Sequence, residues 1–456
     1  MSTLQAIIRY EPAVYADAVQ YLIVDRPFGS RIYRAVYTND PGEVLAVKVV
    51  PAHVISYRKP HNIRNEAAIL SKLSHPNIVY LRSAFYDSEK ELYELHLAMI
   101  ELPLDTLLDH PYFSSHSLPD GLHISTPNPF PAILPELLHS SVVRSLAYQL
   151  ISGTEYIHSL QVAHRDINPG NILLTTTGIL KLVDFGVAWD PSISPFSIVG
   201  EESVEVEQSK ESLDDMCAQI ATGHYRAPEL MYTPKHYNAC ATDLWSLGIT
   251  LSTLFTPLRL QTDEQEEEED NATSSSETSE DIPILKVEPY IFPRKPDGVP
   301  PHATWRRDPI FDASRGEIAL LWSIFKVLGT PTKETWPDFP GHQEGAGIQF
   351  IQAPRQDIAK LMPHLPPADP NPLNLIEALL AYPPSKRLSA SKARVHSWFM
   401  AGEPLLFPTD YSLEPAEGTQ TTNKLQGFTL TQILHYLVDV EHSRFLDTTH
   451  PRSEWD

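Results

Sequence analysis

The chain has 456 residues, a formal net charge of −23 and two cysteines, Cys217 and Cys240. This length suits one large domain with insertions, two cysteines give no disulfide framework, and the acidic balance argues against nonspecific nucleic-acid binding. No apolar run reaches the ~18 residues that span a membrane, and the N-terminus lacks the charged-then-apolar pattern of a signal peptide. We therefore expect a protein of the nucleus or the cytoplasm, with no nucleic-acid and no membrane partner.

Residues 20–102 are predicted to be mainly strands, because apolar runs alternate there with turn signals. One run, Leu-Ala-Val-Lys-Val-Val at 45–50, reads as a buried strand with a single inward lysine, Lys48. A helix-like stretch with one apolar face follows and carries Glu66, which can pair with Lys48. An ordinary surface pair is the alternative, but the apolar flanks favour a functional pair. Met99 is predicted to end the last strand of this region.

The most informative run is His-Arg-Asp-Ile-Asn-Pro-Gly-Asn at 164–171, followed by Asp-Phe-Gly at 184–186. Phosphoryl transfer needs a carboxylate that orients the attacking hydroxyl, an amide oxygen for Mg²⁺, and a second carboxylate that links the metal to the phosphates. Asp166, Asn171 and Asp184 supply these groups in that order, with strand-like runs between them. The set therefore indicates phosphoryl transfer.

Several polar residues near these motifs are predicted to hold the structure together rather than to react. His164 reads as a core residue of its loop, and Asp243 as a residue that holds the backbone of the same loop. Arg387 reads as a structural partner of Glu229 in the sequence Ala-Pro-Glu at 227–229.

Together these motifs resemble those of the protein kinase superfamily over about residues 20–400. Pro-His-Asn-Ile-Arg-Asn-Glu at 60–66 and Phe-Lys-Val-Leu-Gly-Thr-Pro at 325–331 are similar to cyclin-dependent kinases. Val-Ala-Trp at 187–189 and Thr-Gly-His-Tyr-Arg at 222–226 resemble the fungal single-subunit kinases that activate cyclin-dependent kinases.

The resemblance implies an α+β, two-lobed protein kinase fold. It places a small antiparallel β lobe with one helix at about 20–102 and a mainly α-helical large lobe at about 103–400. In the large lobe, helical spacing of apolar residues begins at Ser141. An N-terminal extension, 1–19, and a C-terminal tail, 401–456, flank the domain.

Insertions and a tail helix complete the expected organisation. The insertions lie at 110–139, 190–215 and 261–301. The third is predicted to be disordered, because residues 261–281 hold ten acidic residues and no Lys or Arg. In the tail, the spacing of Leu430, Ile433, Leu434 and Leu437 predicts a short amphipathic helix.

The resemblance also implies the reaction and its cofactors. ATP would donate its γ-phosphate to a serine or threonine hydroxyl, with Asn171 and Asp184 as ligands of Mg²⁺. The protein substrate would be the activation segment of a cyclin-dependent kinase, or of a kinase that activates one, in cell-cycle or transcription control. The catalytic candidates are Asp166, Lys48, Glu66 and Asn168. The nucleotide-binding candidates are Lys48, Val24, Gly29, Ala46, Met99, Glu101, Leu102, Asp105 and Leu173.

Two departures from the family pattern concern the phosphates of ATP. The loop that should read Gly-x-Gly-x-x-Gly keeps one glycine, Gly29, so close backbone approach to the phosphates is compromised. Asn168 stands where serine/threonine kinases usually carry a lysine that contacts the γ-phosphate. Loss of one oriented donor commonly costs ~3 kcal/mol in the transition state.

A third departure concerns activation. Cys217 stands where related kinases carry the activating phosphothreonine, and Asn65 and Trp189 replace two of the three arginines that would bind its phosphate. Arg165 remains. We expect that the activation segment, which includes the 190–215 insertion and closes at Ala-Pro-Glu 227–229, is ordered without phosphorylation. A solvated loop that contacts nothing is one alternative, and an acidic residue that reaches Arg165 is the other. The acidic candidates are Glu201, Glu202, Glu205, Glu207 and Glu211.

Two other functions stay open on the sequence. The poor glycine loop and Asn168 favour a pseudokinase that binds partners without turnover. The helix signature at 60–66 also suits a cyclin-dependent kinase that needs a cyclin-like partner, although Asn65 and Cys217 count against it.

Overall fold

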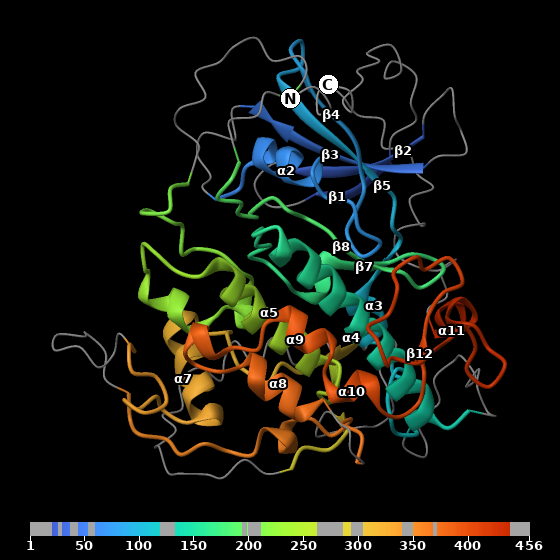
Figure 1. Ribbon diagram of the computed structural model, residues 1–456, viewed down its shortest axis with the longest axis vertical. Coiled ribbons are helices and arrows are strands. Elements are labelled where there is room, and N and C mark those ends of the chain that lie inside the picture. The colour runs from blue at the N-terminus through green and yellow to red at the C-terminus, as the bar shows by residue number, and fades with distance from the viewer. Residues whose placement is uncertain are drawn as a thin grey trace.

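The computed structural model forms two lobes, with a twisted sheet and helix α2 in one and most helices in the other (Figure 1). This confirms the predicted α+β, two-lobed fold. The structure describes residues 21–25, 30–36, 44–52, 60–118, 133–193, 198, 211–261, 286–292, 304–339, 350–367 and 372–437.

The small lobe is built on a five-stranded antiparallel sheet in the order β1-β2-β3-β5-β4. Alternate residues of β3 face opposite sides of this sheet. Leu45 and Val47 are buried with Ala35 on one side, whereas Ala46 and Lys48 line a cavity on the other. The strands are β1 (Tyr21–Asp25), β2 (Arg31–Val36), β3 (Val44–Pro51), β4 (Leu81–Asp87) and β5 (Leu92–Ala98).

Helix α2 (Ile63–Leu70) packs against this sheet and is fixed at its N-terminus. The side chain of Asn62 caps it by accepting hydrogen bonds from the backbone N–H groups of Arg64 and Asn65. The backbone N–H of Asn62 also donates to the carbonyl of Gly186, at 2.9 Å. The start of the helix is therefore tied to the Asp-Phe-Gly sequence of the large lobe.

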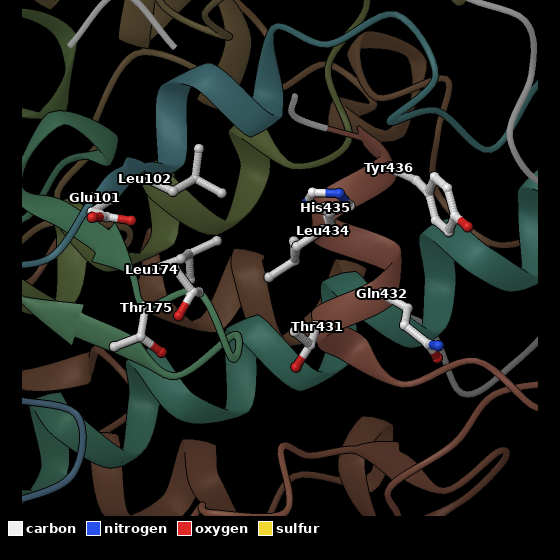
Figure 2. A pocket seen from close by; sticks show the side chains of 10 residues that line it. Glu101, Leu102, Leu174, Thr175, Thr431, Gln432, Leu434, His435 and Tyr436 are labelled. Carbon is white, nitrogen blue, oxygen red and sulfur yellow. The ribbon is translucent and has the colours of Figure 1, made fainter. Parts of the chain in front are cut away.

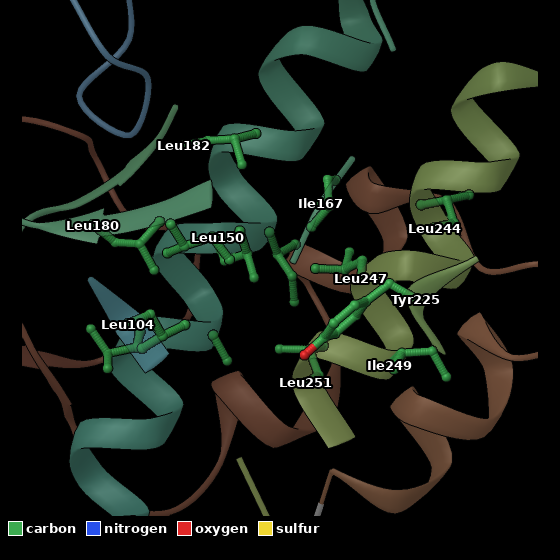
Figure 3. Close-up of a cluster of buried hydrophobic side chains, with 14 of the residues drawn as sticks. Leu104, Leu150, Ile167, Leu180, Leu182, Tyr225, Leu244, Leu247, Ile249 and Leu251 are labelled. Atoms are coloured by element: carbon green, nitrogen blue, oxygen red, sulfur yellow. The ribbon is translucent and has the colours of Figure 1, made fainter. Parts of the chain in front are cut away.

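The large lobe surrounds a cluster of buried aliphatic side chains between α4, α5 and the loop at 164–171 (Figure 3). Ile167 lies in this cluster and anchors the loop. Within the described ranges, no helix has both the length and the apolarity needed to cross a membrane. The helices are α3 (Leu104–Leu108), α4 (Pro135–Ser159), α5 (Ala239–Thr253), α7 (Glu317–Leu328), α8 (Leu373–Leu379), α9 (Ala390–Arg394) and α10 (Ser397–Met400).

Helix α4 begins at Pro135, earlier than the expected start at Ser141. Proline suits the first turn of a helix, because the N–H that it lacks would have no partner there. The end of the predicted 110–139 insertion is therefore helical and belongs to α4. Residues 100–102 follow β5 and join the two lobes, and this segment is called the hinge. A small sheet on the large lobe next to the hinge contains β6 (Leu102–Pro103), β7 (Ile172–Leu174) and β8 (Leu180–Leu182).

The third predicted insertion is partly ordered. Strand β9 (Leu258–Gln261) pairs with β10 (Tyr290–Ile291) in parallel and with β11 (Thr304–Arg307) in antiparallel orientation. The expectation of disorder is therefore wrong for 286–292. The reason is that Tyr290 is buried and its hydroxyl donates toward the carbonyls of Pro111 and His116, each at 3.1 Å. Residues 262–285, which include the acidic stretch, lie outside the described residues.

The C-terminal tail returns along the large lobe to the hinge. Strand β12 (Leu405–Leu406) pairs with β13 (Thr421–Thr422), and helix α11 (Leu430–Leu437) follows. The amphipathic tail helix is confirmed, because the four predicted apolar residues are its buried ones. Figure 2 shows Thr431 and Leu434 of α11 facing Leu102 and Leu174, across a groove of about 490 Å³.

Candidate active site

Lys48 joins Glu66 and Asp184 in an ion triad, in which Lys48 and Glu66 are buried and Asp184 is partly buried. Its Nζ lies 2.7 Å from Oε2 of Glu66 and 2.8 Å from Oδ1 of Asp184. Burial lowers the pKa of Lys48, but the two carboxylates outweigh burial and raise it above its usual value, so the lysine keeps its charge. The structure thus brings together three residues that the sequence placed far apart.

Gly186 makes this close approach sterically feasible. A Cβ at this position would lie 3.1 Å from Oδ1 of Asp184, 3.3 Å from Nζ of Lys48 and 3.4 Å from Oε2 of Glu66. A larger residue would crowd these atoms, so Asp184 or Lys48 would have to shift by a few tenths of an ångström.

Asp166 is held by hydrogen bonds from two directions. Its Oδ1 accepts from the backbone N–H of Thr222 at 2.9 Å and from the hydroxyl of Thr222 at 2.8 Å, and its Oδ2 accepts from the amide of Asn171 at 2.7 Å. The carboxylate therefore sits between the metal-ligand candidate Asn171 and the activation segment. This is where a hydroxyl substrate would meet a phosphate donor.

The backbone of the loop that carries Asp166 is fixed by Asp243, as predicted. The carboxylate of Asp243 is completely buried and accepts from the backbone N–H groups of His164 at 2.8 Å and of Arg165 at 2.7 Å. His158 Nε2 lies 2.9 Å from the same carboxylate. Arg165 has a positive φ of 65°, a conformation that these bonds hold in place.

His164 is a structural residue in this arrangement. It is completely buried, its Nε2 lies 2.9 Å from the carbonyl of Val183, and its ring packs edge-on against Phe185 with centroids 4.7 Å apart. These contacts connect the loop of Asp166 to the residues around Asp184.

The predicted Arg387–Glu229 pair also forms. Both guanidinium Nη atoms lie 2.6 Å from the carboxylate oxygens of Glu229. Arg387 also packs over the ring of Trp245, with its Cζ 5.1 Å from the ring centroid. The end of the activation segment is thereby anchored in the large lobe.

A cavity of about 200 Å³ lies between the lobes beside the ion triad. Six predicted nucleotide-binding residues line it: Lys48, Ala46, Met99, Glu101, Asp105 and Leu173. Burial raises the pKa of Asp105 above its usual value. The cavity has the composition of a nucleotide site, with apolar walls and charged groups at one end.

Three further nucleotide-binding predictions have a different outcome. Leu102 does not line the cavity: its backbone pairs with Leu174 in β6 and β7, and its side chain faces the groove beside α11. A backbone contact from Leu102 to adenine stays a prediction. Val24 lies in β1, although its side chain is outside the described residues, and Gly29 lies outside them as well.

Asn168 is engaged with the backbone of its own loop. Its amide nitrogen donates to the carbonyl of Asp166 at 3.1 Å, and its Oδ1 accepts from the backbone N–H of Gly170 at 3.0 Å. It thereby caps the 3₁₀ turn Pro169–Asn171. A role for Asn168 at the γ-phosphate stays a prediction.

Several residues of the site were not singled out from the sequence. Thr222 was noted only as part of a motif, yet it donates two hydrogen bonds to Asp166. The additional apolar walls of the cavity depend on strand register, because Ile32 lies opposite Lys48 and Leu97 lies opposite Ala46 on neighbouring strands. These walls are formed by Ile32, Val79, Leu97 and Val183.

The donor atoms around Asp184 suit Mg²⁺. The amide nitrogen of Asn171 donates to Asp166, so the amide oxygen of Asn171 is left as a ligand for a metal. Asp184 supplies carboxylate oxygen. Mg²⁺ prefers such oxygen ligands and usually binds through one or two carboxylates together with substrate phosphates and water. Asn171 and Asp184 would hold the metal, which would neutralise charge on the phosphates.

The fold and the site together define an ATP-dependent phosphotransferase. Residues 28–399 match the family model described as "Protein kinase domain", and the chain belongs to the protein kinase family. ATP is therefore its phosphoryl donor and Mg²⁺ its usual cofactor.

The chain is also similar in fold to a solved chain from the yeast RNA Pol II CTD kinase CTDK-1 complex. The two share 22% sequence identity with a TM-score of 0.54, over 89% of this chain and 99% of that chain.

Proposed function

We propose that this kinase phosphorylates serine or threonine in the activation segment of a cyclin-dependent kinase, or of a kinase that activates one. We further propose that it acts as a single chain, in the nucleus or the cytoplasm. The observation that carries autonomous activity is the ion triad of Lys48, Glu66 and Asp184, which is complete in the isolated chain. In kinases this Lys–Glu pair must be in place for catalysis.

The residues of the site have separate tasks in the proposed transfer. Asp166 orients the hydroxyl of the substrate and accepts its proton as the oxygen attacks the γ-phosphorus of ATP. Lys48, positioned by Glu66, donates to phosphate oxygens of ATP. The phosphate ester forms as the bond between the γ-phosphorus and the bridging oxygen breaks, and ADP leaves.

The activating role of the kinase rests on resemblance. The motifs at 187–189 and 222–226 resemble single-subunit activating kinases, and Cys217 cannot take the phosphothreonine role of a conventional cyclin-dependent kinase. We therefore favour an enzyme that is active without prior phosphorylation.

Transfer of γ-phosphate by the purified chain alone tests this function. The substrate is a phosphatase-treated cyclin-dependent kinase, assayed with Mg²⁺ and ATP. We expect transfer to the activation segment of the substrate, and loss of at least ~10²-fold in rate in Asp166→Asn. Asp338→Asn removes the same charge at an exposed position and is expected to leave the rate unchanged.

Two other results have clear meanings. A folded chain that gains activity only when a cyclin-like protein is added would identify a partner-dependent kinase. A folded chain that neither hydrolyses ATP nor transfers its γ-phosphate, with or without the added protein, would identify a pseudokinase. Phosphatase treatment of the kinase itself is expected to leave its activity intact.

A further inference from the structure

The catalytic-loop arginine, Arg165, is paired with a carboxylate of the activation segment. Its Nη1 lies 2.8 Å from Oε1 of Glu211 and its Nη2 lies 2.6 Å from Oε2, so the contact is bidentate. Arg165 is 1% exposed and the Glu211 side chain 11%. Planar pairs of this kind are among the strongest and most directional contacts of arginine.

The same carboxylate is bonded to the position where related kinases are phosphorylated. The backbone N–H of Cys217 donates to Oε1 of Glu211. The hydroxyl of Tyr237 closes the network, because it accepts from Nη1 of Arg165 at 3.0 Å and donates to the carbonyl of Cys217 at 2.7 Å. Arg165, Glu211, Tyr237 and Cys217 therefore form one connected group.

Arg165 connects this group to both halves of the catalytic machinery. Its Nε donates to the carbonyl of Val187 at 2.6 Å, just after the Asp-Phe-Gly sequence, and it directly precedes Asp166. Downstream of Cys217, the segment reaches Thr222 within five residues, and Thr222 bonds to Asp166. Cys217 therefore lies on the same short stretch of backbone as the residue that contacts the catalytic carboxylate.

We propose that Glu211 is a positioning residue that takes the place of the activating phosphate. This inference rests on the proposed function and adds its regulation. A carboxylate carries one negative charge, whereas a phosphate carries about 1.5 to 2. Only one of the three phosphate-binding arginines remains in this chain, so a single negative charge is enough to pair with it. Asn65 and Trp189 occupy the two other receptor positions, so one carboxylate matches the one receptor arginine that remains, Arg165.

The arrangement predicts which kinetic constant Glu211 controls. None of the four residues of the group lines the nucleotide cavity. Loss of the carboxylate should therefore release the segment from Asp166 and lower kcat, while KM for ATP stays the same. A residue that merely supported the whole fold would instead lower the free energy of unfolding and speed amide exchange across the whole chain.

Glu211→Gln tests the proposal, because it keeps the shape of the side chain and removes its charge. The matched control is Asp214→Asn in the same segment, whose side chain is 96% exposed. We expect kcat to fall at least ~10-fold in Glu211→Gln, since a buried arginine that loses its partner is strongly unfavourable. KM for ATP should stay within about twofold, and Asp214→Asn should match the wild type in both constants. Glu211→Asp, which keeps the charge, should recover part of the loss.

Amide hydrogen exchange gives a second readout that needs no turnover. Exchange in the peptide 211–226 should be faster in Glu211→Gln than in the wild type or in Asp214→Asn, with the rest of the chain unchanged. Unchanged kcat and exchange in Glu211→Gln, or equal changes in Asp214→Asn, would overturn the proposal. An inactive wild type would instead remove the proposed function, while the exchange measurement would still decide whether Glu211 orders the segment.

Discussion

At the scale of single residues, the question is whether Asn168 has a structural role or a catalytic one. Both polar atoms of its amide bond to the backbone of the loop, so its main contribution is the cap of the turn Pro169–Asn171. Asn168→Ala should lower the free energy of unfolding by ~1 kcal/mol, as loss of a capping side chain commonly does. It should lower kcat by less than about tenfold, because no donor aimed at phosphate is lost.

Asn171→Ala is the matched control, since it makes the same change three residues later. It removes a proposed metal ligand and a hydrogen bond to Asp166, so kcat should fall by at least ~10²-fold. Urea unfolding and steady-state kinetics on both variants decide the question. A kcat loss of the same size in Asn168→Ala would show that Asn168 acts on the transferred phosphate after all.

At the scale of elements, the C-terminal helix α11 is an integral part of the large lobe. Leu430 and Leu434 pack on the turn between β7 and β8, where a Cβ at Gly178 would lie 2.6 Å from Leu430. The next residue on that turn, Ile179, leads into β8, and the preceding strand carries Leu173 of the nucleotide cavity. The helix therefore supports the strands under the nucleotide site from the far side.

Leu434→Ala should lower the free energy of unfolding by about 2 to 5 kcal/mol, because the side chain is 2% exposed and its removal leaves a cavity. Tyr436→Ala in the same helix is the control: this side chain is 53% exposed and should change stability by less than ~0.5 kcal/mol. Chemical denaturation of both variants measures the difference. Equal stabilities would mean that α11 does not pack on the lobe in solution.

The elements also show how far the sequence can be interpreted. The Lys48–Glu66 pair and the loop of Asp166 were predictable because their motifs combine fixed residue types with strand or helix periodicity, whereas the contact of Asp184 with Lys48 was not predicted. The β9–β10–β11 sheet was not, since its parallel pair joins Leu258 to Tyr290 across an acidic stretch with no pattern of its own. The sequence likewise left open whether the loop contacts nothing or whether one of its five glutamates reaches Arg165, and the path of the loop was needed to select Glu211.

At the scale of the whole molecule, buried histidines should make stability depend on pH. Burial lowers the pKa of several histidines from 6.5 to about 4, and that of two others well below 6.5. Three acids have the opposite effect, because burial raises the pKa of Glu94 to about 7, that of Asp109 to about 6 and that of Asp105 above its usual value. The histidines near 4 are His75, His96, His110 and His224, and the two lower ones are His139 and His364.

The sign of the pH dependence follows from these directions. Between about pH 6.5 and pH 4 the unfolded chain takes up protons on histidines that stay neutral in the fold, and the six histidines outnumber the three acids. The stability that the histidines provide is therefore complete above pH 6.5 and is lost as the pH falls through about 4. Urea unfolding at pH 7, 6 and 5 should give a steadily decreasing free energy of unfolding.

His139 offers a variant that removes part of this dependence. Its ring lies between Phe113 and Phe255, with centroid distances of 5.1 and 6.1 Å, and the charge of Arg307 also opposes its protonation. His139→Phe fits an aromatic ring into the same aromatic surroundings and removes the proton-binding site. Unfolding of the variant should take up about one proton fewer at pH 5, so its stability should fall less steeply between pH 7 and pH 5 than that of the wild type. Parallel curves for the two proteins would show that His139 does not stay neutral in the folded chain.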